Sequence, residues 1–394
     1  MSRRSSAAFA VVALVVMVIS SCSGDDTTIG SPEPTTIANG GTDSVPGDSV
    51  PPTLDVVAGE PFPAARCAAN RAAGTITYLS SYDYAASASI VDVLVAQEKG
   101  YYAALCLDVE IKPSFSTENY PLIASNDAQF SSGGSFSEMV DFAGANDAGF
   151  VALAVEGRTG IDALITKAGA VPTLADVKGR KIGVKGAITP SVKAMLAKQG
   201  LVEGTDYQTV NLEGFDPLVH IQVPDIVGFP GFKSNEPYQL DAAGVKFKLY
   251  DPSDFGIRGS FGVLYTNLTF LEEQPTAAQD FMRATMRGLA DAIDDPVAAA
   301  QVAVAAINAT GNALFLSPEG EIARWAVESK LVDDGVTATA PLGLPLVDEL
   351  TEEVTAYAEI GLFDGVAPVI DTMVDVSVLD GIYDDTSTLV WPTL

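Results

Sequence analysis

The chain has 394 residues, of which 47% are hydrophobic, so it is long and apolar enough to fold into two lobes with their own cores. Its 51 Asp and Glu residues outweigh 22 Lys and Arg residues and give a formal net charge of -29 at pH 7. This charge opposes approach to phosphate backbones and anionic lipid surfaces. Nucleic acid is therefore not an expected partner.

The N-terminus has the pattern of an export signal. Arg3 and Arg4 precede an apolar run over residues 7–19 that is shorter than a membrane-spanning helix. Residues 19–22, Ile-Ser-Ser-Cys, resemble the lipobox of bacterial lipoproteins, whose cysteine is acylated and becomes the mature N-terminus. We expect a signal peptide over residues 1–21 and a lipid on Cys22 that anchors the protein to the outer face of the cytoplasmic membrane. An ordinary cleaved signal with an incidental cysteine is the alternative.

The segment after Cys22 is rich in Thr, Ser, Gly, Asp and Pro and has little to bury, which predicts a flexible linker over residues 22–73. Export places the rest of the chain in an oxidising space, so Cys67 and Cys106 are expected to form a disulfide. The single histidine, His220, alternates with apolar residues and is interpreted as a strand or core histidine. Because the usual zinc ligands are absent, we expect no metal and no cofactor.

From residue 74 the pattern alternates between short apolar runs and amphipathic segments. A strand over residues 75–81, a helix over residues 88–102 that ends near Gly100, and the strand in "LDVEIKP" form a βαβ unit, which requires a parallel sheet. A short strand at residues 128–131 and the run "GFVALAVEG" complete the first half.

A second α/β unit follows, with a strand over residues 181–184, a helix from Ser191, and strands in "YQTVNL", "IVGFP" and "KFKLYD". The remainder becomes helical. Helices are predicted over residues 276–293, 297–308, 319–330 and 346–360. This order indicates an α/β protein of two lobes in which the chain leaves the first lobe and later returns to it.

Four passages carry a family resemblance: "LVAQEKGYYAALCLDVEI", "TLADVKGRKIGVKG", "GFKSNEPYQL" and "SDFGIRGSFGVLYTN". Together they resemble the solute-binding proteins of ABC importers that serve nitrate, sulfonates, taurine and the pyrimidine precursors of thiamine. The resemblance implies the type II periplasmic-binding-protein fold, with two α/β lobes joined by two crossover strands. Lobe one would comprise residues 74–157 and 258–394, with its C-terminal helices packed on it, and lobe two residues 158–257.

In that fold the ligand lies between the lobes, outside the carboxyl ends of the strands. Tyr82 and Tyr84 follow the first strand and could sandwich a flat ligand, or lie in a surface loop. "SSGG" with Ser135, and "GAITPS" in the second lobe, offer hydroxyls and backbone donors at helix N-termini, whose alternative role is helix capping. The ligand-binding candidates are Tyr82, Tyr84, Ser132, Gly133, Gly134, Ser135, Ile188, Thr189, Ser191, Phe229, Glu236, Asp254 and Phe255.

Glu236 resembles the acid in the "NEP" of the thiamine-precursor branch of the family. An ionised carboxylate only accepts hydrogen bonds, so it suits the amino and ring N–H groups of a heterocycle and repels a sulfonate or nitrate. The alternative is a glutamate that orders the chain by accepting backbone N–H groups. The resemblance therefore favours a monomeric lipoprotein that delivers a flat nitrogen heterocycle, a thiamine precursor or a flavin-like ring, to an ABC permease and its ATPase.

Three other functions compete with this one. The first is the same fold binding sulfonate, taurine or nitrate through a cation such as Lys185 or Arg258, and the second is a sensor of ligand occupancy. The third is an enzyme, since the family includes pyrimidine synthases. Those enzymes carry a cysteine-rich run and a substrate-supplying histidine that have no counterpart here, so no enzymatic activity is expected.

Overall fold

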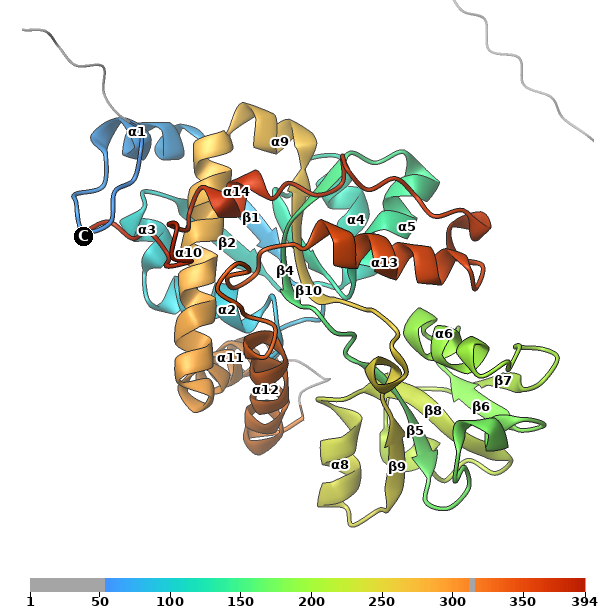
Figure 1. The fold of residues 1–394 in the computed structure, drawn as a ribbon. Helices are drawn as coiled ribbons and strands as arrows, with labels where there is room; N and C mark the ends of the chain where they lie inside the picture. Colours follow the sequence, from blue (N-terminus) through green and yellow to red (C-terminus); the bar gives the residue numbers. More distant parts are fainter. Residues whose placement is uncertain (1–53, 312–315, 394) are drawn as a thin grey trace, which may run out of the picture. The chain divides into compact units, whose positions relative to one another are not determined.

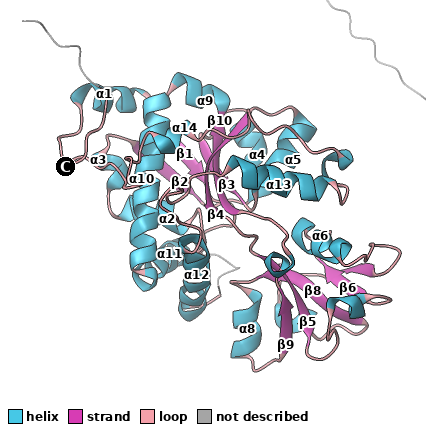
Figure 2. Ribbon diagram, viewed as in Figure 1, coloured by secondary structure: helices cyan, strands magenta, loops and turns pink. Residues whose placement is uncertain are grey.

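The computed structural model describes residues 54–311 and 316–393, whose secondary structure is drawn in Figures 1 and 2. The predicted signal peptide, Cys22 and residues 22–53 of the predicted linker lie outside the described residues. Within the described part, no helix combines the length and apolar character needed to cross a bilayer.

Lobe one is built on a five-stranded sheet in the order β2-β1-β3-β10-β4. The first three of these strands are parallel, with Ile76 opposite Val109, and β10 runs antiparallel to both β3 and β4. Strand β10 comes from a distant part of the chain, so the sheet is completed only when the chain returns from lobe two. The strands are β1 (Thr75–Leu79), β2 (Asp108–Lys112), β3 (Phe130–Gly133), β4 (Phe150–Gly157) and β10 (Phe261–Asn267).

Lobe two repeats this plan in the order β7-β6-β8-β5-β9. Strand β6 is parallel to β7 and β8, and β5 is antiparallel to β8 and β9. The strands are β5 (Asp162–Lys167), β6 (Lys181–Val184), β7 (Gln208–Asn211), β8 (Ile226–Phe232) and β9 (Phe247–Tyr250). The helices of lobe two are α6 (Pro190–Lys198), α7 (Pro217–His220) and α8 (Glu236–Ala242), with 3-10 turns η1 (Leu174–Val177) and η2 (Pro252–Phe255).

Two segments join the lobes, one from β4 to β5 and one from β9 to β10, as the two-lobe prediction required. They pass each other at two glycines. A Cβ atom at Gly259 would lie 2.8 Å from the Cα atom of Gly160, so no larger residue fits at this crossing without a shift of the backbone. This close crossing sets the point at which the chain passes from one sheet to the other.

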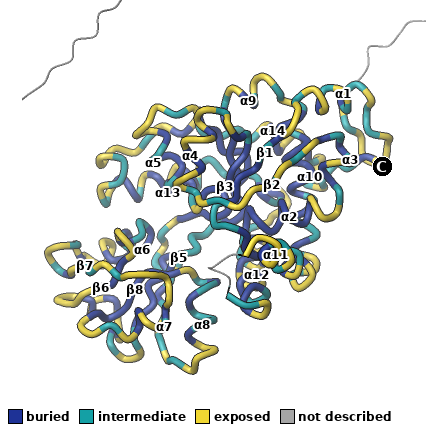
Figure 3. Tube along the Cα trace, turned by 180° about the vertical axis from the view of Figure 1, so that it is seen from behind, coloured by how far each residue is buried: buried dark blue, intermediate teal, exposed yellow. Residues whose placement is uncertain are grey.

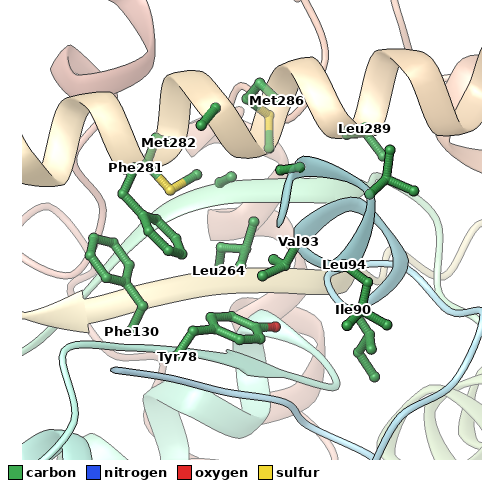
Figure 4. Packing of buried hydrophobic residues seen from close by; sticks show 14 of the residues in the cluster. Tyr78, Ile90, Val93, Leu94, Phe130, Leu264, Phe281, Met282, Met286 and Leu289 are labelled. Carbon is green, nitrogen blue, oxygen red and sulfur yellow. The ribbon is translucent and has the colours of Figure 1, made fainter. Parts of the chain in front are cut away.

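The core of lobe one lies between its sheet and two helices, α2 (Val91–Glu98) and α10 (Pro275–Asp294). Phe281 of α10 stacks on Phe130 of β3 with ring centroids 4.0 Å apart, as Figure 4 shows. Gly288 lets the two helices approach closely, because a Cβ atom there would lie 2.3 Å from the carbonyl oxygen of Asp92. Buried residues accordingly run along β1, β3 and α2 (Figure 3).

The C-terminal helices pack mainly on lobe one and lie close to the predicted ranges. A second apolar cluster covers the other face of the sheet and includes residues of α4, α5 and α13. The remaining helices of lobe one are α3 (Tyr101–Ala104), α4 (Ser116–Ala124), α5 (Phe136–Asn146), α9 (Leu268–Glu273), α11 (Pro296–Thr310), α12 (Pro318–Asp333), α13 (Val347–Ala358), α14 (Ser377–Asp380) and the turn η3 (Leu362–Gly365).

The end of the predicted linker is structured, because residues 64–72 form helix α1 (Ala64–Ala72) on lobe one. Arg66 donates to the buried carboxylate of Asp280 at 2.6 Å, and Asn70 donates to the same oxygen at 2.8 Å. These partners lie more than 200 residues away, so no local pattern could reveal them. The predicted disulfide between Cys67 and Cys106 is present in the structure and ties α1 to the loop before β2.

Two local predictions need correction. His220 is buried, as expected of a core residue, but it ends the short helix α7 rather than lying in a strand. Asp216 caps that helix by accepting the N–H of Leu218, and Pro217 occupies its first turn, so capping overrides the alternation of apolar residues. Gly100 does end α2, but the chain resumes a helical turn directly after it as α3.

Candidate functional site

Two adjoining cavities lie between the lobes, with volumes of about 450 and 510 Å³. We name the first the serine cavity, because eight serines line it, and the second the Glu236 cavity. The eight serines are Ser81, Ser87, Ser89, Ser116, Ser135, Ser137, Ser234 and Ser260. The cavities share Tyr82, Asp162, Thr189, Phe232 and Asn235.

The site forms where strands end. Tyr82 follows β1, Gly134 follows β3, and Asn235 follows β8, so loops from both sheets converge on one gap. Parallel strands direct their carboxyl ends to the same edge of a sheet, which is where ligands of open α/β sheets bind. The lining therefore combines residues that are distant in the sequence.

Six of the thirteen predicted ligand residues line these cavities. Their backbone positions agree with the strand-end argument, and their contact with a ligand remains a proposal. Tyr82 and Thr189 line both cavities. The other four are Gly133, Gly134 and Ser135 in the serine cavity and Glu236 in the Glu236 cavity.

The other seven candidates line neither cavity. Four of them contact other residues within their own lobe. The Tyr84 hydroxyl donates to the carbonyl of Ile111, so this tyrosine does not pair with Tyr82 across either cavity. The Ser132 hydroxyl bonds that of Tyr78 in the core. Ile188 and Phe229 are buried in two apolar clusters of lobe two.

The last three belong to lobe two and its link to lobe one. Asp254 is exposed in η2, and Phe255 packs against a core cluster of lobe two. Ser191 lines neither cavity, but its hydroxyl donates at 3.0 Å to Asp162, which lines both. Phe229 was predicted to line the site, but Phe232 lines it instead. Side chains of a strand alternate between its two faces, so residues three positions apart point to opposite faces.

Glu236 is 2% exposed and is the first residue of α8. Its Oε2 atom accepts the backbone N–H of Phe232 at 2.7 Å, and its Oε1 atom lies 3.5 Å from the Nζ atom of Lys185. The carboxylate thus orders the end of β8, as the structural alternative proposed. Each oxygen can accept more than one hydrogen bond, so this role leaves acceptor capacity toward the cavity.

Carboxylates outnumber cations around the two cavities, six to two. Both cations are paired: Arg324 donates to Glu321 at 2.8 and 3.0 Å, and Lys185 lies beside Glu236. Arg258, the other predicted cation, pairs with Glu349 and Glu352 and lines neither cavity. The six acids are Glu138, Asp141, Asp162, Asp216, Glu236 and Glu328.

The N-terminus of α5 already holds a carboxylate of the chain itself. A Cβ atom on Gly134 would lie 2.7 Å from Oε2 of Glu138, and Ser116 donates to Oε1 at 2.9 Å. Burial raises the pKa of Glu138, while hydrogen bonds from Ser116 and from the N–H of Gly134 oppose the rise. The N–H of Gly134 therefore faces Glu138. The next three N–H groups, of residues 136–138, donate to Ser260, Glu353 and Ser135, so the backbone donors at this helix end already have partners within the chain.

Burial also raises the pKa of two further lining acids. The pKa of Asp162 rises to about 6 through desolvation, with the nearby charge of Glu236 adding to the rise and the Ser191 hydroxyl opposing it. Desolvation likewise raises the pKa of Glu328, against hydrogen bonds from Ser234 and from Ser87.

Glu328 also connects the lobes. Its Oε1 atom accepts from the Ser234 hydroxyl of lobe two at 2.6 Å, and its Oε2 atom accepts from Ser87 of lobe one at 2.7 Å. Arg324, one turn earlier on α12, donates to Asn235 of lobe two at 3.2 Å. Sequence reasoning missed these residues, because α12 is more than 80 residues from its partners in lobe two.

Two α/β lobes of this topology, with cavities at the carboxyl ends of their strands, define the type II periplasmic-binding-protein fold. The family model described as NMT1/THI5 like matches residues 87–299, more than half of the chain, and the chain belongs to this family.

Solved structures with the same fold include a putative sulfonate-binding SsuA from Methylobacillus flagellatus KT, with a TM-score of 0.57 and 16% identity over 78% of this chain and 92% of that one. The nitrate-binding protein NrtA from Synechocystis PCC 6803 has a TM-score of 0.53 and 16% identity over 78% and 87% of the two chains.

A curated relative, the riboflavin-binding protein RibY of Chloroflexus aurantiacus, is 28% identical over 123 residues. The match covers 31% of this chain and about a third, 34%, of that relative.

Proposed function

We propose that this protein is the extracytoplasmic solute-binding component of an ABC importer and that it captures a flat nitrogen heterocycle between its lobes. The class of ligand is a thiamine pyrimidine precursor or a flavin-like ring. Membership of the NMT1/THI5-like family and the fold shared with import proteins support the general role. The local match to a riboflavin-binding protein supports the heterocycle.

One observation carries the choice of ligand: the site is rich in hydrogen-bond acceptors, and its two cations are already paired. A sulfonate or nitrate would bring its charge toward six acids, and the backbone N–H groups at the N-terminus of α5 already donate to Glu138, Ser260, Glu353 and Ser135. A heterocycle with amino and ring N–H groups instead supplies donors to these oxygens.

Aromatic side chains provide faces for a flat ring. Tyr82 and Phe232 line both cavities, while Phe215 and Tyr238 line the Glu236 cavity. Aromatic pairs add about 0.5 to 1.5 kcal/mol beyond the burial of their area. We therefore assign the ring to the Glu236 cavity, with Glu236 at its edge and Tyr82 or Phe232 at its face.

The role proposed is binding without chemistry. His220, the only histidine, bonds the carbonyl of Glu213 at 3.0 Å and lines neither cavity, so it cannot serve a ligand there as a base. The lipid on Cys22, a monomeric state, and a permease and ATPase as partners are further parts of the proposal, because a binding protein of this kind must release its cargo to a membrane complex.

A second candidate ligand is an oxyanion. Two proteins that share this fold, the putative sulfonate-binding SsuA and the nitrate-binding NrtA, favour it. It would require Lys185 to leave Glu236 and face the ligand.

Isothermal titration of the purified full-length protein, stripped of bound ligand, tests the two candidates side by side. The panel contains a hydroxymethylpyrimidine thiamine precursor, riboflavin, taurine and nitrate. We expect at least one heterocycle to bind and neither anion to bind. Binding of taurine or nitrate without any heterocycle would overturn the proposal.

A further inference from the structure

Eight serines line the serine cavity and none lines the Glu236 cavity, and these serine hydroxyls come from both lobes. Ser81, Ser87 and Ser116 come from lobe one, and Ser234 from lobe two. The aromatic residues Phe215 and Tyr238 line only the Glu236 cavity. The gap between the lobes therefore has a serine-rich part, to which Phe261 also contributes, and a part without serines that has two aromatic residues of its own. The two parts meet at the five residues that the cavities share.

The orientation of these hydroxyls matters for the ligand. Ser87 and Ser234 both donate hydrogen bonds to Glu328, and Ser116 donates one to Glu138. A hydroxyl whose proton is held by a carboxylate still has lone pairs to offer, so it serves as an acceptor. The Ser81 hydroxyl, by contrast, has no partner among the described residues and can donate or accept.

Such a lining suits a chain that carries several hydroxyl groups. Each ligand hydroxyl can donate to a serine oxygen or a carboxylate and can accept from a free serine. A phosphate or carboxylate in the same place would meet Glu138, Asp141 and Glu328, while Arg324 is held by Glu321. The hydroxylated chain that fits therefore carries no negative charge.

The two volumes, about 450 and 510 Å³, exceed the room that a single small ring needs. We propose that the ligand is a flat nitrogen heterocycle bearing a neutral polyhydroxylated chain, with the ring in the Glu236 cavity and the chain in the serine cavity. This inference rests on the proposed function and narrows it, because it separates a ring with such a chain from a bare pyrimidine and from a phosphorylated analogue.

Three flavins that differ only in the chain test it by titration of the stripped full-length protein. Riboflavin carries a ribityl chain, lumiflavin carries a methyl group, and flavin mononucleotide carries a phosphorylated chain. We expect riboflavin to bind at least about tenfold more tightly than either of the others, the effect of one or two net hydrogen bonds or of one repelled charge.

Variants of serines in the serine cavity test whether the ribityl chain of riboflavin binds there. Ser81→Ala is expected to weaken riboflavin about three- to tenfold and to leave lumiflavin unchanged. Ser116→Ala is the second variant, and Ser125→Ala, an exposed serine outside both cavities, is the control. Thermal unfolding of each variant shows that it is folded.

The outcomes separate the two proposals. Equal binding of riboflavin and lumiflavin, or binding of flavin mononucleotide as tight as that of riboflavin, overturns the chain assignment. Binding of the bare pyrimidine without riboflavin overturns it too, but leaves the proposed function standing. Binding of taurine or nitrate alone, or of no compound in the panel, overturns both.

Discussion

The substitution Glu236→Gln isolates the charge of the acid that we place at the edge of the ligand ring. Glutamine keeps the shape and retains one carbonyl oxygen, which can still accept the N–H of Phe232 now bonded at 2.7 Å. Glu236→Ala is a poorer test, because it leaves that partly buried N–H without its acceptor and so lowers stability by up to about 1 to 3 kcal/mol.

The expected effect follows from the strength of the lost interaction. A hydrogen bond to a charged group contributes about 1.5 to 3 kcal/mol, and one between neutral groups about 0.5 to 1.5 kcal/mol. The difference, about 1 to 1.5 kcal/mol, weakens binding of the heterocycle about five- to twelvefold. The unfolding free energy should fall by at most about 1 kcal/mol, since the partner Lys185 is 32% exposed and can be solvated.

Calorimetric titration measures the loss, and chemical denaturation measures stability. Asp241→Asn is the matched control, because Asp241 lies on the same helix, is exposed and lines neither cavity. Unchanged affinity in Glu236→Gln, or an equal loss in Asp241→Asn, would refute the role of this carboxylate.

Three further predictions concern the disulfide, pH and the link between the lobes. Replacing Cys67 and Cys106 by serine should cost about 4 kcal/mol in chemical denaturation, from the entropy of a loop with a sequence separation of 39; an unchanged midpoint would contradict this. The pKa of Asp162 is raised to about 6, so the folded protein holds this proton where the unfolded chain has lost it, and this group lowers stability as pH rises from about 4 to 6. A ligand N–H favours the ionised form, so affinity should rise from pH 5 to 7, and Asp162→Asn should flatten that profile. Ser234→Ala removes the 2.6 Å bond to Glu328 across the lobes and should speed ligand dissociation about tenfold in stopped-flow measurements, whereas an unchanged rate would argue against that contact.

The elements with a clear periodicity could be predicted from the sequence. Strand β6 begins and ends at the predicted residues, because its run is too short for a helix and is flanked by Gly179 and Gly186. Helix α10 differs by one residue at each end, because its long amphipathic run has the helical period. Strand β10 was missed. All seven of its residues are buried, so it shows no alternation, and it joins its sheet through neighbours that are more than 100 residues away.

The site was predictable only where it follows from a strand end. Tyr82, Gly134 and Thr189 lie in the loops that follow strands β1, β3 and β6, and they line the cavities. The roles of Glu328 and Arg324 depend on how α12 packs between the loops of both lobes, which is a matter of tertiary contact. Local pattern carries no information about such contacts.

In the proposed function, the two lobes close over a flat, uncharged nitrogen heterocycle and exclude anions. Native mass spectrometry of the protein as purified, followed by release of the bound molecule and its absorption spectrum, tests this most directly. The account predicts a released molecule that absorbs in the near ultraviolet or visible range and carries no sulfonate or phosphate. A released sulfonate, or nitrate found in stoichiometric amount, would contradict it.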